Sequence, residues 1–160
     1  MPEVIEIPAE EQAAIAAAWL ERTLAAYPPQ TSRFLKQEKD RFRNPVGYAL
    51  RHGLPVLVGE LLGGMNAERI TPVLDEIMRM RAVQDFTPSR ALSFLFELKP
   101  VLREASPLPA AAEVEERIDR LALEAFDLYV ACRERMHEIK TREAGRRTFV
   151  EARMKSGSIS

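Results

Sequence analysis

The chain has few of the residues that metal sites and nucleophilic enzymes use. Among 160 residues there is one cysteine, Cys132, and there are two histidines, His52 and His137. A metal site needs several clustered ligands, and Cys132 and His137 are five residues apart on one predicted helix, so they do not share a face. The same spacing excludes a Cys–His nucleophile pair. A lone cysteine forms no internal disulfide, which suits a reducing cytosol.

Other missing sequence features exclude further classes of function. Gly59, Gly63 and Gly64 lack the spacing and the following lysine of a phosphate-binding loop. No apolar run approaches the roughly 18 residues of a membrane span, and residues 1–8 carry glutamates instead of the apolar core of a signal peptide. The net charge of −1 creates no global attraction to nucleic acid or anionic lipid. We therefore expect a cytoplasmic, non-enzymatic protein with no cofactor, no nucleic-acid partner and no membrane insertion.

What remains is typical of one globular domain. The hydrophobic fraction is 46% and the charged fraction 29%, with no repeat and no low-complexity linker. We expect a single domain over residues 1–160, with an N-terminal arm at 1–8 and a frayed tail at 155–160. Strand patterns are missing, whereas helix signals recur, so the predicted fold class is all-α.

The first three helices have clear boundaries. The first is predicted from Ala9 to Ala26, before Pro28-Pro29, and a short second helix from Thr31 to Phe42, with Phe34, Leu35 and Phe42 inward. Asn44-Pro45, an N-cap followed by proline, opens a third helix that ends at Gly63-Gly64, with a kink expected at Pro55.

Three more helices follow. Asn66 or Thr71-Pro72 begins a fourth that ends near Asp85, and Thr87-Pro88 begins a fifth that runs to Glu104. The fifth is apolar nearly all round, which predicts the centre of the core, and Pro100 should kink its last turn. After a predicted loop at 106–109, the longest segment extends from Ala110 to at least Lys140 and up to Arg153.

The last helix is apolar on more than one side. Its main seam steps by fours and threes, as in a coiled coil, through Val114, Ile118, Leu121, Ala125, Leu128 and Cys132. Leu123 and Val130 lie on its other side. At about 1.5 Å per residue, even the stretch from Ala110 to Lys140 is roughly 46 Å long, more than a domain of this size covers. We expect a homodimer built on this helix, with Ile118, Leu121, Ala125, Leu128 and Cys132 as the candidate interface.

One polar constellation stands out, at the joint between the fourth and fifth helices. It comprises Arg81, Gln84, Asp85, Phe86 and Ser89. One interpretation is a structural knot that caps a helix end and orders the turn. The other is a site that senses a ligand or contacts a partner.

Basic residues gather in two stretches. Residues 33–51 hold six Lys/Arg against Glu38 and Asp40, and residues 133–155 hold eight against four acidic residues. Aromatic stacking partners and recognition-helix motifs are missing beside them. A solvated face or a docking surface for an acidic partner is the better interpretation.

Three segments together resemble a known family. They are Trp19-Leu20-Glu21-Arg22-Thr23-Leu24 with Tyr27-Pro28-Pro29, then Glu38-Lys39-Asp40-Arg41-Phe42 with Asn44-Pro45-Val46-Gly47, and the run from Arg79 through Leu92. They resemble the N-terminal domain of the RsbT co-antagonists, the RsbR-type proteins of bacterial stress signalling.

The resemblance implies a globin-like, dimeric, non-haem sensory domain. In the family this domain precedes a STAS domain that a partner kinase phosphorylates, and no such domain follows within residues 1–160. The ends of the sequence favour a stand-alone protein over a fragment, so its output is expected to be a protein contact.

The sequence therefore predicts an all-α domain of six main helices, globin-like or bundle-like, acting as a dimeric sensory or regulatory module with a protein partner. Two alternatives stay open. The core could bind a small hydrophobic ligand or haem, or the chain could be a structural accessory subunit of a larger complex.

The purified protein should be colourless. Haem coordination needs an imidazole directed into a pocket, and His52 and His137 both lie in charged or polar surroundings that predict exposure. An absorption spectrum after incubation with hemin and gel filtration checks this. A stoichiometric Soret band retained by the protein would contradict it.

Overall fold

The computed structural model describes residues 3–105 and 111–157, and these residues form helices without any strand. The helices are α1 (Ala9–Ala25), α2 (Pro29–Gln37), α3 (Pro45–Leu62), α4 (Ala67–Val83), α5 (Pro88–Phe96), α6 (Leu98–Glu104) and α7 (Ala111–Gly157). The all-α class with a long C-terminal helix is confirmed. The predicted loop at 106–109 lies outside the described residues.

The six predicted main helices are present, with the fifth divided in two. The division at Glu97, between α5 and α6, has a simple cause. Pro100 has no N–H for the carbonyl of Phe96, four residues earlier, and its ring would clash with that carbonyl. The proline thus separates two helices, where the sequence predicted a kink in one.

Two helix starts are fixed by side-chain caps that the sequence predicts. The Asn44 side chain accepts a hydrogen bond from the Gly47 amide at 2.9 Å, and Pro45 occupies the first helical position. Asn66 caps α4 in the same way, through the Glu68 amide at 3.0 Å. Of the two predicted starts of the fourth helix, Asn66 is therefore correct, and Pro72 lies inside α4.

Helix α3 is the centre of the core, in place of the predicted fifth helix. Ten of its eighteen residues are buried, and it packs against α1, α2, α4 and α7. Leu54 and Leu57 have no exposed surface. In contrast, Phe96 of α5 is 44% exposed, because α5 turns one side to solvent.

Helix α2 is shorter than predicted and buries less. It ends at Gln37, and of the three residues predicted inward only Leu35 is buried. Phe34 and Phe42 are exposed, since the chain leaves the helix before Phe42 can turn toward the core. The N-terminal segment is held against the end of α3 through Ile5, whose amide donates a hydrogen bond to the Leu62 carbonyl at 2.7 Å.

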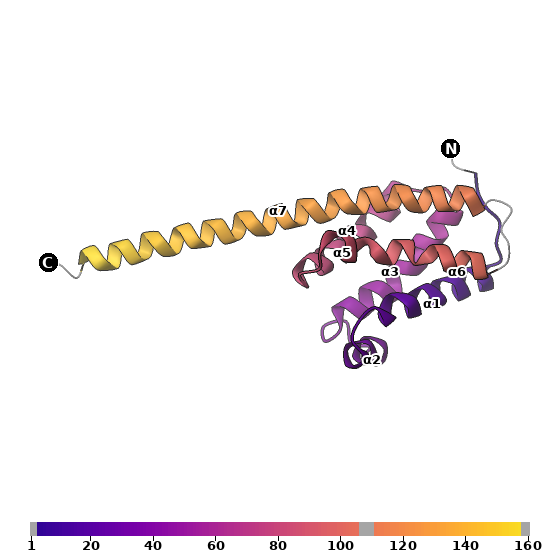
Figure 1. Ribbon diagram of the computed structural model, residues 1–160, viewed down its shortest axis with the longest axis horizontal. Coiled ribbons are helices and arrows are strands. Elements are labelled where there is room, and N and C mark those ends of the chain that lie inside the picture. Colours follow the sequence, from indigo (N-terminus) through magenta and orange to yellow (C-terminus); the bar gives the residue numbers. More distant parts are fainter. Residues whose placement is uncertain (1–2, 106–110, 158–160) are drawn as a thin grey trace.

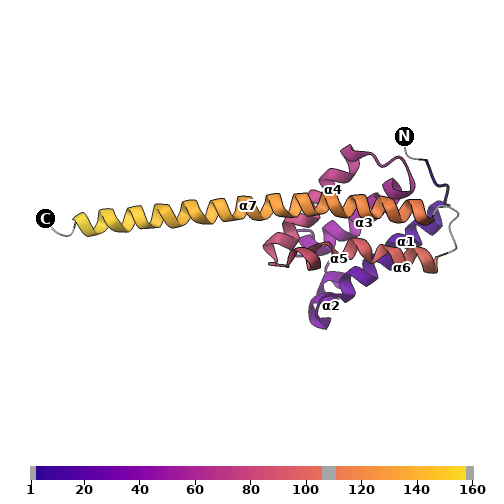
Figure 2. The ribbon, with the colours of Figure 1, turned by 45° about the horizontal axis from the view of Figure 1, so that its top comes forward.

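Helix α7 is much longer than the body it covers. Figures 1 and 2 show its first half lying along the other helices, with α5 and α6 between it and α1, and its second half projecting freely. Residues 137–157 are all exposed. This stretch, which we call the arm, is about 30 Å long at 1.5 Å per residue. Residues 155–157, predicted as frayed, continue the helix, and residues 158–160 lie outside the described part.

Truncating α3 should therefore cost the most stability. Leu57→Ala leaves a cavity at a site with no exposed surface and should lower the free energy of unfolding by about 2–5 kcal/mol. Phe42→Ala, at a residue that is 85% exposed, is the control and should change it by less than about 0.5 kcal/mol. Urea denaturation of both variants measures the difference. Equal losses would show that the core is centred elsewhere.

Candidate functional site

The five residues of the predicted constellation meet at the joint between α4 and α5. The amide of Phe86 bonds the carbonyl of Arg81 at 3.3 Å, and the amide of Asp85 bonds the carbonyl of Ala82 at 3.2 Å. These two bonds form a Schellman motif, which ends a helix with one residue in the left-handed region. That residue is Asp85, with φ of 61°. Asp85 thus ends α4 at the turn that leads into α5.

The joint also connects α4 to helix α7. The Asp85 carboxylate lies 3.1 Å from Nη1 of Arg133, and the Tyr129 hydroxyl donates to the Phe86 carbonyl. The Gln84 Oε1 accepts from the Tyr27 hydroxyl at 3.1 Å, which adds the end of α1. Ser89 is exposed, and its hydroxyl lies 3.4 Å from that of Thr87. Three helices besides α5 therefore converge on one turn.

Arg81 is the member of this group with unusual surroundings. It is 97% buried, and three aromatic rings surround its guanidinium, with the Cζ atom 4.9 Å from the Phe86 centroid, 5.1 Å from Phe94 and 5.5 Å from Tyr27. Its recorded hydrogen bond, from Nη1 to the Arg90 carbonyl, is long at 3.5 Å. Within the described residues, Nη2 of Arg81 is the buried side-chain nitrogen or oxygen that lacks a partner.

Burial lowers the pKa of the Arg81 guanidinium. The nearby positive charge of Arg90 lowers this pKa further, whereas Tyr27 raises it. Cation–π contacts with three rings offset part of the cost of burying the charge. A buried cation is ordinarily matched by a carboxylate, but none of the ion pairs within residues 3–105 and 111–157 involves Arg81.

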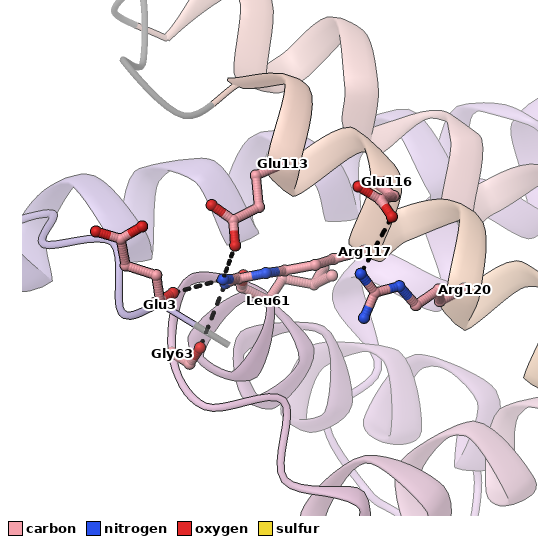
Figure 3. A network of polar contacts seen from close by, with 7 residues as sticks. All are labelled: Glu3, Leu61, Gly63, Glu113, Glu116, Arg117 and Arg120. Carbon is pink, nitrogen blue, oxygen red and sulfur yellow. Dashed lines mark hydrogen bonds and ion pairs between the residues drawn. The ribbon is translucent and has the colours of Figure 1, made fainter. Parts of the chain in front are cut away.

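The second buried arginine, Arg117 of α7, provides the contrast. Its Nη1 donates to the carbonyls of Leu61 at 2.7 Å and Gly63 at 3.3 Å. Its Nη2 donates to the Glu3 carbonyl at 2.5 Å and the Glu113 carboxylate at 2.6 Å. Figure 3 shows these acceptors converging on one guanidinium from α3, the N-terminal segment and α7. Arg117 is saturated with partners and closes the end of α3. Nothing in the sequence pattern distinguished it from the exposed arginines around it.

The pocket beside Arg81 lies between α1, α4 and α5. It has a volume of about 330 Å³ and is lined by Arg22, Thr23, Ala25, Ala26, Arg81, Ser93, Phe94 and Glu97. Both lining hydroxyls already donate to backbone, Thr23 to the Trp19 carbonyl at 2.8 Å and Ser93 to the Arg90 carbonyl at 2.9 Å. At the rim, Arg22 and Glu97 form an ion pair of 2.9 Å. Among the side chains that line the pocket, Arg81 therefore carries the buried nitrogen, Nη2, that has no hydrogen-bond partner.

Other residues considered from the sequence lie apart from this site. His52 and His137 are exposed, as expected. No group of three or more His, Cys, Asp or Glu side chains within residues 3–105 and 111–157 has a metal-binding arrangement, and no helix in those ranges is long and apolar enough to cross a membrane.

The candidate dimer seam is mostly buried in the protomer. Ile118, Leu121, Ala125 and Cys132 are at most 4% exposed, and Leu128 packs against the same core. The first four side chains form the inner face of α7 and offer little surface to a partner, whereas Leu128 is partly exposed.

The described residues thus form an all-helical domain with a long terminal helix. The family model for the RsbT co-antagonist protein rsbRD N-terminal domain matches residues 13–144. The chain belongs to this family, which confirms the resemblance drawn from residues 19–29, 38–47 and 79–92. No curated protein and no solved structure matches the chain, and the globin-like arrangement stays a prediction.

Removing the saturated arginine should destabilise the fold. Arg117→Met leaves the buried Leu61 carbonyl without its partner, at a cost of about 1–3 kcal/mol, and also releases the N-terminal segment. Arg120→Met is the matched control. It lies on the same helix with an i−4 glutamate, Glu116, at 3.2 Å, but both side chains are exposed (Figure 3). That variant should lose at most about 0.5 kcal/mol, as measured by thermal unfolding. Equal losses would contradict the role assigned to Arg117.

Proposed function

We propose that this chain is a non-enzymatic regulatory domain of bacterial stress signalling that acts through protein contacts, the first of them with a second copy of itself. Membership of the rsbRD N-terminal domain family supports the regulatory role. The observation that carries the contact is the outward face of α7, which has an apolar patch that the protomer leaves uncovered. A cytoplasmic location is part of the proposal, supported by the single cysteine, which is buried and unpaired.

The outward patch consists of Leu123, Phe126 and Val130. Leu123 is 70% exposed and Phe126 is 45% exposed, while Val130 is partly exposed. Their spacing of three and four residues places them on one side of the helix, about a third of a turn round from the buried seam. The predicted excess of apolar surface on this helix is thus present. A neighbouring helix is the simplest cover for a patch of this shape.

Beyond Arg133 and Glu134, the same side of α7 carries uncharged or weakly charged residues in the first part of the arm. His137, Thr141, Ala144 and Thr148 follow Val130 at intervals of seven, four, three and four residues. Small and uncharged side chains permit close approach of a second helix. An unpaired helix of about 20 residues is marginally stable in water, so a partner along this line would also stabilise the arm.

An open groove lies beside the patch. It has a volume of about 770 Å³ and runs between the α4–α5 joint and α7, where Val130, Arg133 and His137 line one wall and Phe86 and Pro88 the other. Side chains from a second α7 could enter it. Contact there would reach the turn at Asp85. Dimer formation would then be coupled to the conformation of the α4–α5 joint.

The remaining sides of the arm favour a second protein of acidic character. Residues 137–157 hold six Lys/Arg against three glutamates. This excess supports docking of an acidic surface, as in an accessory subunit of a larger complex. Recovery of one stoichiometric partner from native cytoplasm, lost when the arm is deleted, would favour that second function.

Light scattering tests the dimer. The wild type should give a mass of about 36 kDa, twice the 18.1 kDa of one chain, at micromolar concentration. Leu123→Asp and Phe126→Asp each place a carboxylate in the proposed contact and should weaken the dimer about 100-fold or more. Circular dichroism should show both variants folded, since neither residue belongs to the core.

Phe42→Asp is the control. Phe42 is 85% exposed, but it lies between α2 and α3, and α2 packs against α1 and α3. This variant should dimerise as the wild type does. A wild-type mass of 18 kDa, or a dimer unaffected by both α7 substitutions, would contradict the proposal.

A further inference from the structure

Arg81 is a buried cation without an anionic partner among the described residues. Its guanidinium is enclosed by Tyr27, Phe86 and Phe94, its Nη2 has no hydrogen-bond partner, and it lines a pocket that opens to the surface. An unpaired buried donor costs about 1–3 kcal/mol, more when it is charged. A protein that keeps such a group in a pocket gains stability when an anion enters.

Local charge favours an anion over a neutral ligand. Arg90 places a second guanidinium 5.1 Å from the Phe86 ring, on which Arg81 also lies. Arg22 at the rim is neutralised by Glu97, so the pocket keeps a net positive charge. The planar fork of a guanidinium matches a carboxylate with two parallel hydrogen bonds.

The size and lining of the pocket restrict the ligand further. A volume of about 330 Å³ is at the lower end of small-molecule sites. Away from Arg81 the wall is formed by Ala25, Ala26 and Phe94, and the hydroxyls of Thr23 and Ser93 are committed to backbone carbonyls. The ligand should therefore carry one anionic group and a short apolar body.

We propose that the pocket between α1, α4 and α5 binds a small monocarboxylate, whose carboxylate accepts hydrogen bonds from Arg81 and whose apolar chain lies against Ala25, Ala26 and Phe94. The site lies apart from the outward face of α7, so it does not depend on the dimer. It deepens the regulatory function by naming the class of signal that the domain would bind.

A structural change caused by a bound ligand could reach α7 through few residues. Phe86, whose ring lies on the Arg81 guanidinium, accepts a hydrogen bond through its carbonyl from Tyr129 of α7. The next residue back, Asp85, pairs with Arg133 of the same helix. A shift of Arg81 toward a ligand therefore moves groups that touch the helix proposed to contact the partner.

Butyrate and its uncharged analogue butyramide test the proposal. Butyrate should bind with a dissociation constant of about 1 mM, ordinary for six non-hydrogen atoms. At about 100 mM it should then raise the melting temperature by about 5–10 °C relative to sodium chloride of equal ionic strength. Butyramide has the same shape without the charge and should give no comparable rise. Equal shifts with both compounds, or none with butyrate, would overturn the proposal.

Variants locate the binding. Arg81→Leu should abolish the butyrate shift, whereas Arg79→Leu, an exposed arginine of the same helix paired with Asp75, should leave it unchanged. Ala25→Phe adds a large side chain at the exposed mouth of the pocket and leaves Arg81 in place, and it should also abolish the shift while the protein stays folded. This second variant decides the matter if Arg81→Leu fails to fold. A butyrate shift that survives Ala25→Phe would place the ligand elsewhere and refute the site.

Discussion

Helix α7 has two apolar faces along its first half, and the globular body can cover only one of them. The inner face, from Val114 to Cys132, is mostly buried against the protomer. The outer face keeps Leu123 and Phe126 in solvent, and the arm beyond residue 137 has no body beneath it. Hydrophobic burial sets the position of the first half, and the same physics leaves the outer face in need of a partner. The proposed dimer follows from this mismatch between helix length and domain size.

The two buried arginines show how one residue type can serve structure or binding. Arg117 is matched by four acceptors, so it fixes the meeting point of α3, α7 and the N-terminal segment. Arg81 has aromatic faces and one distant carbonyl. The first arrangement is complete by itself, and the second becomes complete when an anion arrives. The unmatched group lies at the turn that connects α4 and α5 to α7, where binding could be transmitted.

Much of the fold could be predicted from local chemistry. Asn44-Pro45 and Asn66 announce helix starts because capping needs only neighbouring residues. Pro100 was expected to disturb its helix and did so one turn earlier, because proline acts on the carbonyl four residues back. The sequence predicted less well what covers each apolar helix face. Periodicity identified an inner seam on α7 but could not tell whether the body or a partner covers it, since both leave the same apolar pattern. Arg81 was selected from its context, but its burial without a partner depends on Tyr27 and Phe94, which are distant in sequence.

Hydrogen–deuterium exchange of the arm tests the central claim most directly. Amides in residues 137–157 of an unpartnered helix open readily and exchange fast, whereas a helix packed along a partner is protected. The account predicts that exchange in this stretch slows as protein concentration rises through the dimer range, together with the amides around Leu123 and Phe126. Fast exchange of the arm at every concentration, with no change around those two residues, would contradict a partner on the outward face of α7.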